Sequence, residues 1–213
     1  MDEETFLSLH GERDGTTSFL RSIRSIPQAE RIFTEDPLVK KDDLFEIAVV
    51  GCSYGMEAYS YAMICETNGF ANYRVDGYDV HPKRLEVGRR GWYHFGWATE
   101  IALTDPRIKR GLAFKEHKYG QDVVFIDRLV RDKTKFFQHD ISLSPLPRFY
   151  DLLVCTNVLR QVQRGGRQDA IENLLRSLKE GGLVIQNYDH FNVDEELKRR
   201  VNLSVQHELG LLI

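Results

Sequence analysis

The residues best suited to chemistry begin with a loop that carries two glycines, Gly51-Cys52-Ser53-Tyr54-Gly55-Met56-Glu57. Glycines let a backbone turn sharply and approach a ligand closely. The loop lacks the Lys-Ser/Thr pair of a P-loop and the spacing of G-x-G-x-x-G. Because Glu57 would repel a phosphate, the loop favours a cationic cofactor without phosphate. Taken alone, it is equally compatible with a tight strand-to-helix turn.

An acidic residue, Asp79, follows in the sequence GYDVHP. A carboxylate about twenty residues past a glycine loop, at the end of the next strand, can accept hydrogen bonds from both hydroxyls of a ribose. The alternative is an N-cap for the following helix, and one side chain can fill both roles. Loop and acid in this order predict a nucleoside-binding site.

Two later segments place polar residues where they could contact other parts of a nucleoside cofactor. Asp140, in FQHDI, follows a third apolar segment and is a candidate for contact with an adenine amino group. Asn157, in CTNVL, follows a fourth, near the amino-acid end of the cofactor or the substrate. Ordinary loop capping is the alternative for both residues. His81 and His139 have no apparent third partner, so no metal site is expected.

These residues need a sheet to bring them together. Short apolar runs predict buried strands at Phe45–Val50, Tyr73–Val80, Thr134–Gln138, Tyr150–Thr156 and Leu183–Tyr188. Helical patterns separate or flank them at Thr16–Phe33, Met56–Thr67, Pro82–Arg90, Arg167–Lys179 and Asp194–Val201. The stretch Gly91–Thr134 is expected to hold one or two helices and a hairpin near Val123–Leu129, and Val205–Ile213 a last strand. This alternation predicts an α/β fold with a mostly parallel sheet and helices on both faces. Ligands bind such sheets at the carboxyl ends of the strands, just after Val50, Tyr78, Gln138 and Val154.

Composition excludes several other classes. The chain has 213 residues, 42% hydrophobic and 29% charged, with a net charge of −3, so nucleic-acid binding has no global electrostatic support. No apolar run is long enough to cross a bilayer, and the acidic, polar start of the chain is unlike a secretory signal. The three cysteines are expected to be reduced thiols. We therefore expect a cytoplasmic protein with a segment at 1–44 of short helices and one ligand-binding domain at 45–213.

The motifs together resemble the CheR family of chemotaxis-receptor methyltransferases, which use S-adenosylmethionine to methylate receptor glutamates. The resemblance runs from about Thr16 to Asn187. It is carried by TTSFLR, GCSYGMEAYSYA, YDVHPKRLEVGRRGWY, FFQHDISLSP, YDLLVCTNVL and LKEGGLVIQNYDH. It implies a Rossmann-like S-adenosylmethionine-dependent methyltransferase fold.

The resemblance also implies a role for each matching position. Arg21 would lie near the transferring methyl as the catalytic residue, Glu57 at the polar end of the cofactor and Asp79 on the ribose. Asp140 and Ile141 would surround the adenine. The full expected cofactor-binding set is Thr17, Arg21, Gly51, Ser53, Gly55, Glu57, Asp79, Val80, Asp140, Ile141, Thr156 and Asn157.

Three departures from the family pattern concern the acceptor rather than the cofactor. The family's Cys-Arg-Asn-Val is here Cys155-Thr156-Asn157-Val158, and the tyrosine expected four residues after the Asn is Gln161. Only residues 1–44 precede the first expected strand, so most of the family's N-terminal helical domain is not expected in this chain.

The leading hypothesis is an S-adenosylmethionine-dependent methyltransferase that releases S-adenosylhomocysteine. Its acceptor would be a carboxylate of a protein or of a small molecule, since an ionised carboxylate needs no general base, and Asp140 or His139 would serve as a weak base for other acceptors. One alternative is a signalling module that senses the cofactor or binds a protein without catalysis. Another alternative is a nicotinamide-dependent dehydrogenase, which would use the same kind of sheet. This chain, however, lacks the G-x-G-x-x-G loop of that class.

Overall fold

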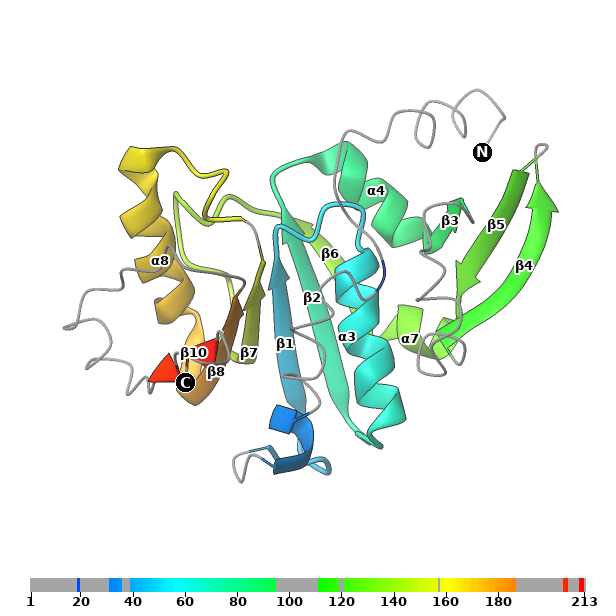
Figure 1. The fold of residues 1–213 in the computed structure, drawn as a ribbon, viewed down its shortest axis with the longest axis horizontal. Helices are drawn as coiled ribbons and strands as arrows, with labels where there is room; N and C mark the ends of the chain where they lie inside the picture. The colour runs from blue at the N-terminus through cyan, green and yellow to red at the C-terminus, as the bar shows by residue number, and fades with distance from the viewer. Residues whose placement is uncertain are drawn as a thin grey trace.

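A seven-stranded sheet forms the centre of the molecule, shown in Figure 1. The computed structural model describes residues 19, 31–35, 39–94, 111–118, 121–156, 158–186, 205–206 and 211–212. The strand order is β6-β2-β1-β7-β8-β10-β9. The first five strands in that order are parallel and the last two pair antiparallel. They span Thr134–Gln138, Tyr73–Asp79, Phe45–Val50, Tyr150–Cys155, Leu178–Gln186, Leu211–Leu212 and Val205–Gln206, respectively.

Strand β1 is buried on both faces, as its continuous apolar sequence FEIAVV predicts. Ile47 and Val49 point into a core shared with helices α3 (Met56–Thr67), α4 (Pro82–Arg90) and α7 (Arg128–Asp132). Ala48 and Val50 point into a second core shared with α8 (Arg167–Arg176). The predicted α/β fold with helices on both faces is therefore confirmed.

A smaller antiparallel sheet has the order β3-β5-β4, with bounds Trp92–His94, Gln121–Ile126 and Leu112–Lys118. It lies beside α4 and α7, as Figure 1 shows. The predicted hairpin near Val123–Leu129 is wrong in its placement. Its strands are β4 and β5, and the residues after Asp127 form α7 instead, because the Asp127 side chain caps that helix by accepting from the Leu129 amide.

Helix α8 ends earlier than predicted. Ser177 stops it: the Ser177 hydroxyl donates to the Asn173 carbonyl and accepts from the Leu146 amide, which ties the end of the helix to another loop. Strand β8 then begins at Leu178 and contains the two glycines that were expected to close the helix. Its register against β7 shifts between Tyr150 and Leu152 to accommodate them.

Other predicted boundaries agree to within a residue, including those of β1, β2, α3, α4, β6 and β7. The tail holds two short paired strands, not one. The helix predicted at Asp194–Val201 lies outside the described residues, as does most of Thr16–Phe33, of which residues 31–33 are helical. Phe33 packs against Phe45 and Phe70. The domain boundary at 44/45 stays a prediction. Within the described residues, no helix combines the length and apolar character needed to cross a membrane.

Candidate cofactor-binding site

The glycine loop folds over the carboxyl end of β2. The amides of Gly51 and Cys52 both donate to the Tyr78 carbonyl, at 2.7 and 3.0 Å. Gly51 has φ +70°, a left-handed conformation that favours glycine, and a side chain there would overlap Val158. The loop ends at Gly55, which lies directly before the first residue of α3.

Asp79 fixes this loop from the end of β2. Its side chain is 7% exposed. One carboxylate oxygen accepts from the Ser53 amide at 2.8 Å and the other from the His81 amide at 2.9 Å. A carboxylate has about four lone-pair positions. Two amides therefore leave acceptor capacity for further donors. The N-cap alternative is met in part, since His81 is the N-cap residue of α4 and Asp79 binds its amide.

Ser53 is unusual in two respects. It is the non-glycine residue with positive φ (51°) among the described residues. Its hydroxyl oxygen is buried and makes no hydrogen bond to any described residue. A buried hydroxyl without a partner costs about 1–3 kcal/mol. This hydroxyl therefore marks a position where a ligand would supply the missing hydrogen bond.

Glu57, in the first turn of α3, is 8% exposed and faces Thr156 at the end of β7. The Thr156 hydroxyl oxygen lies 2.8 and 2.7 Å from the two carboxylate oxygens. The amino end of a helix favours a negative charge, so the position suits an ionised Glu57.

The loop after β6 carries Asp140 and Ile141. One Asp140 oxygen accepts from both the amide and the hydroxyl of Ser142, at 2.9 and 2.6 Å. The Ile141 carbonyl accepts from Asn173 on α8, which anchors the loop to that helix. The loop-capping alternative for Asp140 is thus part of the structure, and Ile141 presents an apolar side chain beside it.

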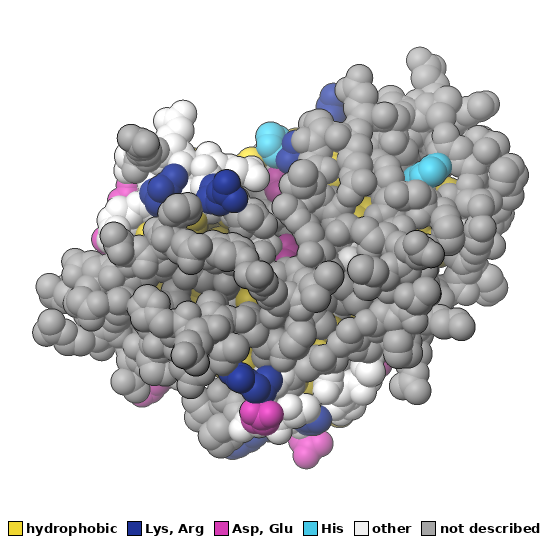
Figure 2. Space-filling model, in the orientation of Figure 1, with side chains coloured by type: hydrophobic (Ala, Val, Ile, Leu, Met, Phe, Trp, Pro, Cys, Tyr) yellow, Lys and Arg dark blue, Asp and Glu magenta, His cyan; other side chains and the backbone are white. Residues whose placement is uncertain are grey.

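A cavity of about 780 Å³ opens between these segments, within the size range of ligand pockets. Figure 2 shows His, Lys or Arg, and Asp or Glu side chains near the upper edge of the molecule, where β1 and β2 end in Figure 1. The residues that line the cavity are Val50, Gly51, Ser53, Asp79, Val80, His81, Arg84, His139, Asp140, Ile141, Ser142, Thr156, Val158, Gln161, Val162, Gln163 and Gly166.

The cavity brings together seven of the predicted residues: Gly51, Ser53, Asp79, Val80, Asp140, Ile141 and Thr156. Gly55 and Glu57 do not line it, although Glu57 touches Thr156. Thr17, Arg21 and Asn157 lie outside the described residues. The sequence interpretation missed Arg84 and Gln163 as lining residues. For Arg84, the signal was its place in the first turn of a helix that starts at the binding edge.

Two buried thiols flank this site. Burial raises the pKa of Cys52, and the charges of Asp79 and Glu57 raise it further. Burial, followed by the charge of Glu57, raises the pKa of Cys155 to about 12. Both cysteines are therefore protonated at neutral pH and do not act as nucleophiles.

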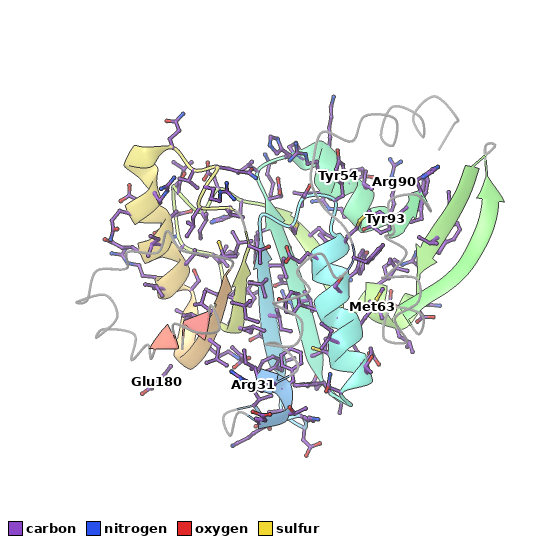
Figure 3. The ribbon with its side chains drawn as sticks, viewed as in Figure 1. Arg31, Tyr54, Met63, Arg90, Tyr93 and Glu180 are labelled. Atoms are coloured by element: carbon purple, nitrogen blue, oxygen red, sulfur yellow. The ribbon has the colours of Figure 1, made fainter. Side chains whose placement is uncertain are left out.

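The second sheet is joined to the glycine loop through Tyr93. Its hydroxyl donates to the Tyr54 carbonyl at 2.8 Å, and Figure 3 shows the two residues close together. The ring of Tyr93 also packs edge-on against Phe19, with centroids 5.3 Å apart. Tyr93 thus contacts both the loop and a residue two positions before Arg21.

The sequence model described as "CheR methyltransferase, SAM binding domain" matches residues 15–205 of the chain. The chain belongs to the CheR methyltransferase family. The family's cofactor is S-adenosylmethionine, and the parallel sheet with its glycine loop is the Rossmann-like methyltransferase fold.

Chemotaxis protein methyltransferases from two Listeria species match part of the chain. The chemotaxis protein methyltransferase of Listeria monocytogenes is 30% identical over 134 residues, which cover 62% of this chain and 48% of the relative. That of Listeria innocua is 29% identical over the same shares. The chain thus spans about half the length of these relatives.

Solved methyltransferase structures are similar at low sequence identity. An amino pentose methyltransferase from Micromonospora echinaspora is 14% identical, with a TM-score of 0.47 over 78% of this chain and 50% of that one. The glycopeptide N-methyltransferase MtfA is 12% identical, with a TM-score of 0.46 over 76% and 52%.

The residues of this CheR-family site have hydrogen-bonding groups that fit S-adenosylmethionine. Asp79 retains acceptors for a ribose diol, the Ser53 hydroxyl lacks a partner among the described residues, and the absence of a side chain at Gly51 lets Val158 pack directly against the loop. The part of the chain that the structure describes contains no group of three or more His, Cys, Asp or Glu side chains placed to hold a metal ion.

Proposed function

We propose that this CheR-family chain binds S-adenosylmethionine in the cavity between the glycine loop and the β6–β7 loop, and transfers its methyl group to a carboxylate. The observation that carries the proposal is the position of the Asp79 carboxylate at the cavity edge, where it accepts from the Ser53 amide of the glycine loop and from the His81 amide at the start of α4. Asp79 would hold the ribose, while Ile141, Val80 and Asp140 would surround the adenine.

When bound, S-adenosylmethionine supplies a methyl group already activated by its positively charged sulfur and leaves as S-adenosylhomocysteine. The chain's residues therefore need to align the acceptor and exclude water more than to activate it. An ionised carboxylate needs no base. The thiols of Cys52 and Cys155 stay protonated beside the site. The acceptor itself would therefore be the nucleophile.

Arg21 is our candidate for steering the acceptor, by a charge-assisted hydrogen bond to its carboxylate. Support comes from the resemblance and from Phe19, two residues earlier, which is buried against Tyr93. We expect Arg21→Ala to lower turnover more than cofactor affinity. The acceptor would be a glutamate of a protein or a small-molecule acid.

The test uses methyl-labelled S-adenosylmethionine with protein fractions and with small carboxylic acids. A carboxyl methyl ester is hydrolysed by mild alkali and releases labelled methanol, whereas N-methyl and ether products do not. Labelled methanol after alkali supports the proposal. Stable label would instead mean an amine or hydroxyl acceptor and would reject the carboxylate.

A second candidate is a module that binds the cofactor without catalysis. It is favoured by Gln161, which lines the cavity in place of the family's tyrosine. Tight binding of S-adenosylhomocysteine with no transfer to any acceptor fraction would support it, and turnover on any acceptor would exclude it.

A further inference from the structure

Two tyrosine hydroxyls meet across β1, in the core that the sheet shares with α8. Tyr78 comes from β2 and Tyr150 from β7, and both side chains are buried there. Strand β1 lies between these two strands in the sheet. At the level of Asp76, its residue on this face is Ala48. The small side chain of Ala48 leaves space in which side chains from β2 and β7 join.

The two hydroxyls belong to a chain of hydrogen bonds with a fixed direction. The Tyr150 hydroxyl donates to Asp76 at 2.9 Å, and Arg74 donates to the same carboxylate twice, at 2.9 and 2.7 Å. Since the single proton of Tyr150 goes to Asp76, the Tyr78 hydroxyl must donate to Tyr150. Burial raises the pKa of both tyrosines, so both hydroxyls stay protonated at neutral pH. Asp76 therefore fixes the direction of the Tyr150 hydroxyl, and Tyr150 that of Tyr78.

The carboxylate at the end of this chain is fully buried. The Asp76 side chain is 0% exposed, whereas its partner Arg74 is 24% exposed. Taking such a pair out of water is unfavourable, and well-packed apolar side chains of similar volume are often at least as stabilising. Apolar packing would not, however, fix the direction of a hydroxyl, whereas a hydrogen bond does. Orientation is thus what this pair supplies to the tyrosines.

Tyr78 connects the chain of hydrogen bonds to two walls of the cavity. Its backbone carbonyl accepts from the amides of Gly51 and Cys52 in the glycine loop. Its ring lies edge-on to the ring of His139, with centroids 5.8 Å apart, and His139 lines the cavity from the loop after β6. Asp79 directly follows Tyr78 in the sequence. A shift of Tyr78 would therefore displace both walls together with Asp79.

We propose that Tyr78 and Tyr150 are positioning residues for the cofactor, whose mutual hydrogen bond holds Asp79 and the glycine loop in the arrangement that binds S-adenosylmethionine. This rests on the proposed function, in which the cofactor occupies the cavity beside Asp79. Neither tyrosine lines that cavity, so the two hydroxyls act through their neighbours. Their effect is preorganisation: a site already held in its binding arrangement loses less freedom when the ligand enters.

The experiment measures the affinity of the full chain for S-adenosylhomocysteine by calorimetry, well below the unfolding temperature of each variant. Tyr150→Phe keeps the buried ring but removes the acceptor for Tyr78 and the donor to Asp76. We expect it to raise the Kd by roughly threefold to tenfold, the size of one buried hydrogen bond.

Tyr78→Phe removes the same hydrogen bond from its other end. It leaves the contact of Tyr150 with Asp76 intact, so it decides the question should Tyr150→Phe not fold. We expect a similar loss of affinity. The double variant should bind about as well as the weaker single variant, because both changes remove one shared interaction.

Tyr73→Phe is the matched control. Tyr73 is also a buried tyrosine of β2, but it lies in the other core, where its hydroxyl donates to Glu66 at 2.8 Å. Thermal unfolding should show a loss of stability in this variant as in Tyr150→Phe. Its affinity for S-adenosylhomocysteine should stay at the wild-type value, which separates positioning of the site from general stability.

The outcomes distinguish this inference from the proposed function. No binding of S-adenosylhomocysteine to the wild-type chain would reject the proposed cofactor site and this inference with it. Wild-type binding that Tyr78→Phe leaves unchanged, or that Tyr73→Phe weakens equally, would overturn the inference alone. Losses that add in the double variant would also overturn it, because the two hydroxyls would then act independently.

Discussion

The Tyr93 hydroxyl, from the second sheet, donates a hydrogen bond to the carbonyl of Tyr54 in the glycine loop. Tyr93 is fully buried, and burial raises its pKa well above the usual tyrosine value. The hydroxyl is therefore a protonated donor throughout the physiological range. The small sheet and the cofactor loop are joined at this point.

We expect Tyr93→Phe to lower the free energy of unfolding by about 1–2 kcal/mol, because it removes one buried hydrogen bond and leaves the carbonyl acceptor behind. Edge-on packing against Phe19 should persist, since the ring remains. Urea denaturation measures the loss. Tyr73→Phe is a reference variant, because its hydroxyl binds Glu66 at a distance from the loop. An unchanged free energy of unfolding in Tyr93→Phe would show that the hydrogen bond to Tyr54 does not stabilise the fold.

Gly51 and Gly69 allow a matched test of how closely Val158 packs against the glycine loop. Both have left-handed φ, 70° and 76°, so alanine costs about 1 kcal/mol of backbone strain at either position. Only at Gly51 does the added methyl overlap Val158, whereas at Gly69 it meets open space. We expect Gly51→Ala to impair cofactor binding and Gly69→Ala to leave it intact, as measured by calorimetry. The double variant Gly51→Ala/Val158→Ala should recover part of the affinity, and its failure to do so would reject the overlap as the cause.

Alkaline pH should destabilise the fold through Tyr78. Burial raises its pKa to about 12. Since an unfolded tyrosine ionises near pH 10, the stability that Tyr78 contributes is complete below about pH 10 and is lost as pH rises through about 12. The loss should be on the order of 1–3 kcal/mol. Urea unfolding at pH 9 and at pH 11.5 measures it.

Tyr78→Phe is the matching variant, because phenylalanine cannot ionise. Its unfolding free energy should fall less between the two pH values than that of the wild type. The buried partner Tyr150, which binds both the Tyr78 hydroxyl and Asp76, also has a raised pKa through burial, so some alkaline sensitivity should remain. An identical pH slope in both proteins would show that Tyr78 ionises normally in the fold.

The cysteines should resist alkylation in the folded protein. Cys52, Cys65 and Cys155 are all buried as free thiols, and burial raises the pKa of each. Because the thiolate is the reactive form, iodoacetamide at pH 7.5 should label them slowly until denaturant is added. Mass spectrometry counts the labels; rapid labelling of Cys155 without denaturant would mean that the end of β7 opens readily.

Local patterns predicted the part of the fold that positions the site. Strand β1 and helix α3 were predicted with their observed bounds, because six apolar residues stop at Gly51 and strong helix formers follow Gly55. Strand β4, with the sequence LAFKEHK, has no such continuous apolar run. Its pairing with β5 depends on tertiary contacts that the pattern alone does not reveal.

The candidate site was predictable as a set of residues but not as a set of contacts. Glycines and acids after successive strands placed Gly51, Asp79 and Asp140 at one sheet edge. The contact of Thr156 with Glu57 joins residues 99 positions apart, and side-chain hydrogen bonds over such separations leave no pattern in a single sequence. Ser53 was included by resemblance, and only the structure revealed its buried hydroxyl.

The most direct test is a calorimetric titration of S-adenosylhomocysteine into the wild-type chain and into Asp79→Asn, with Asp132→Asn on the exposed surface of α7 as the control. The account predicts one site in the wild type and in the control, no heat with NAD, and affinity reduced by roughly tenfold or more in Asp79→Asn, which loses a charged acceptor for the ribose. Equal affinity in all three proteins, or no binding to the wild type, would contradict it.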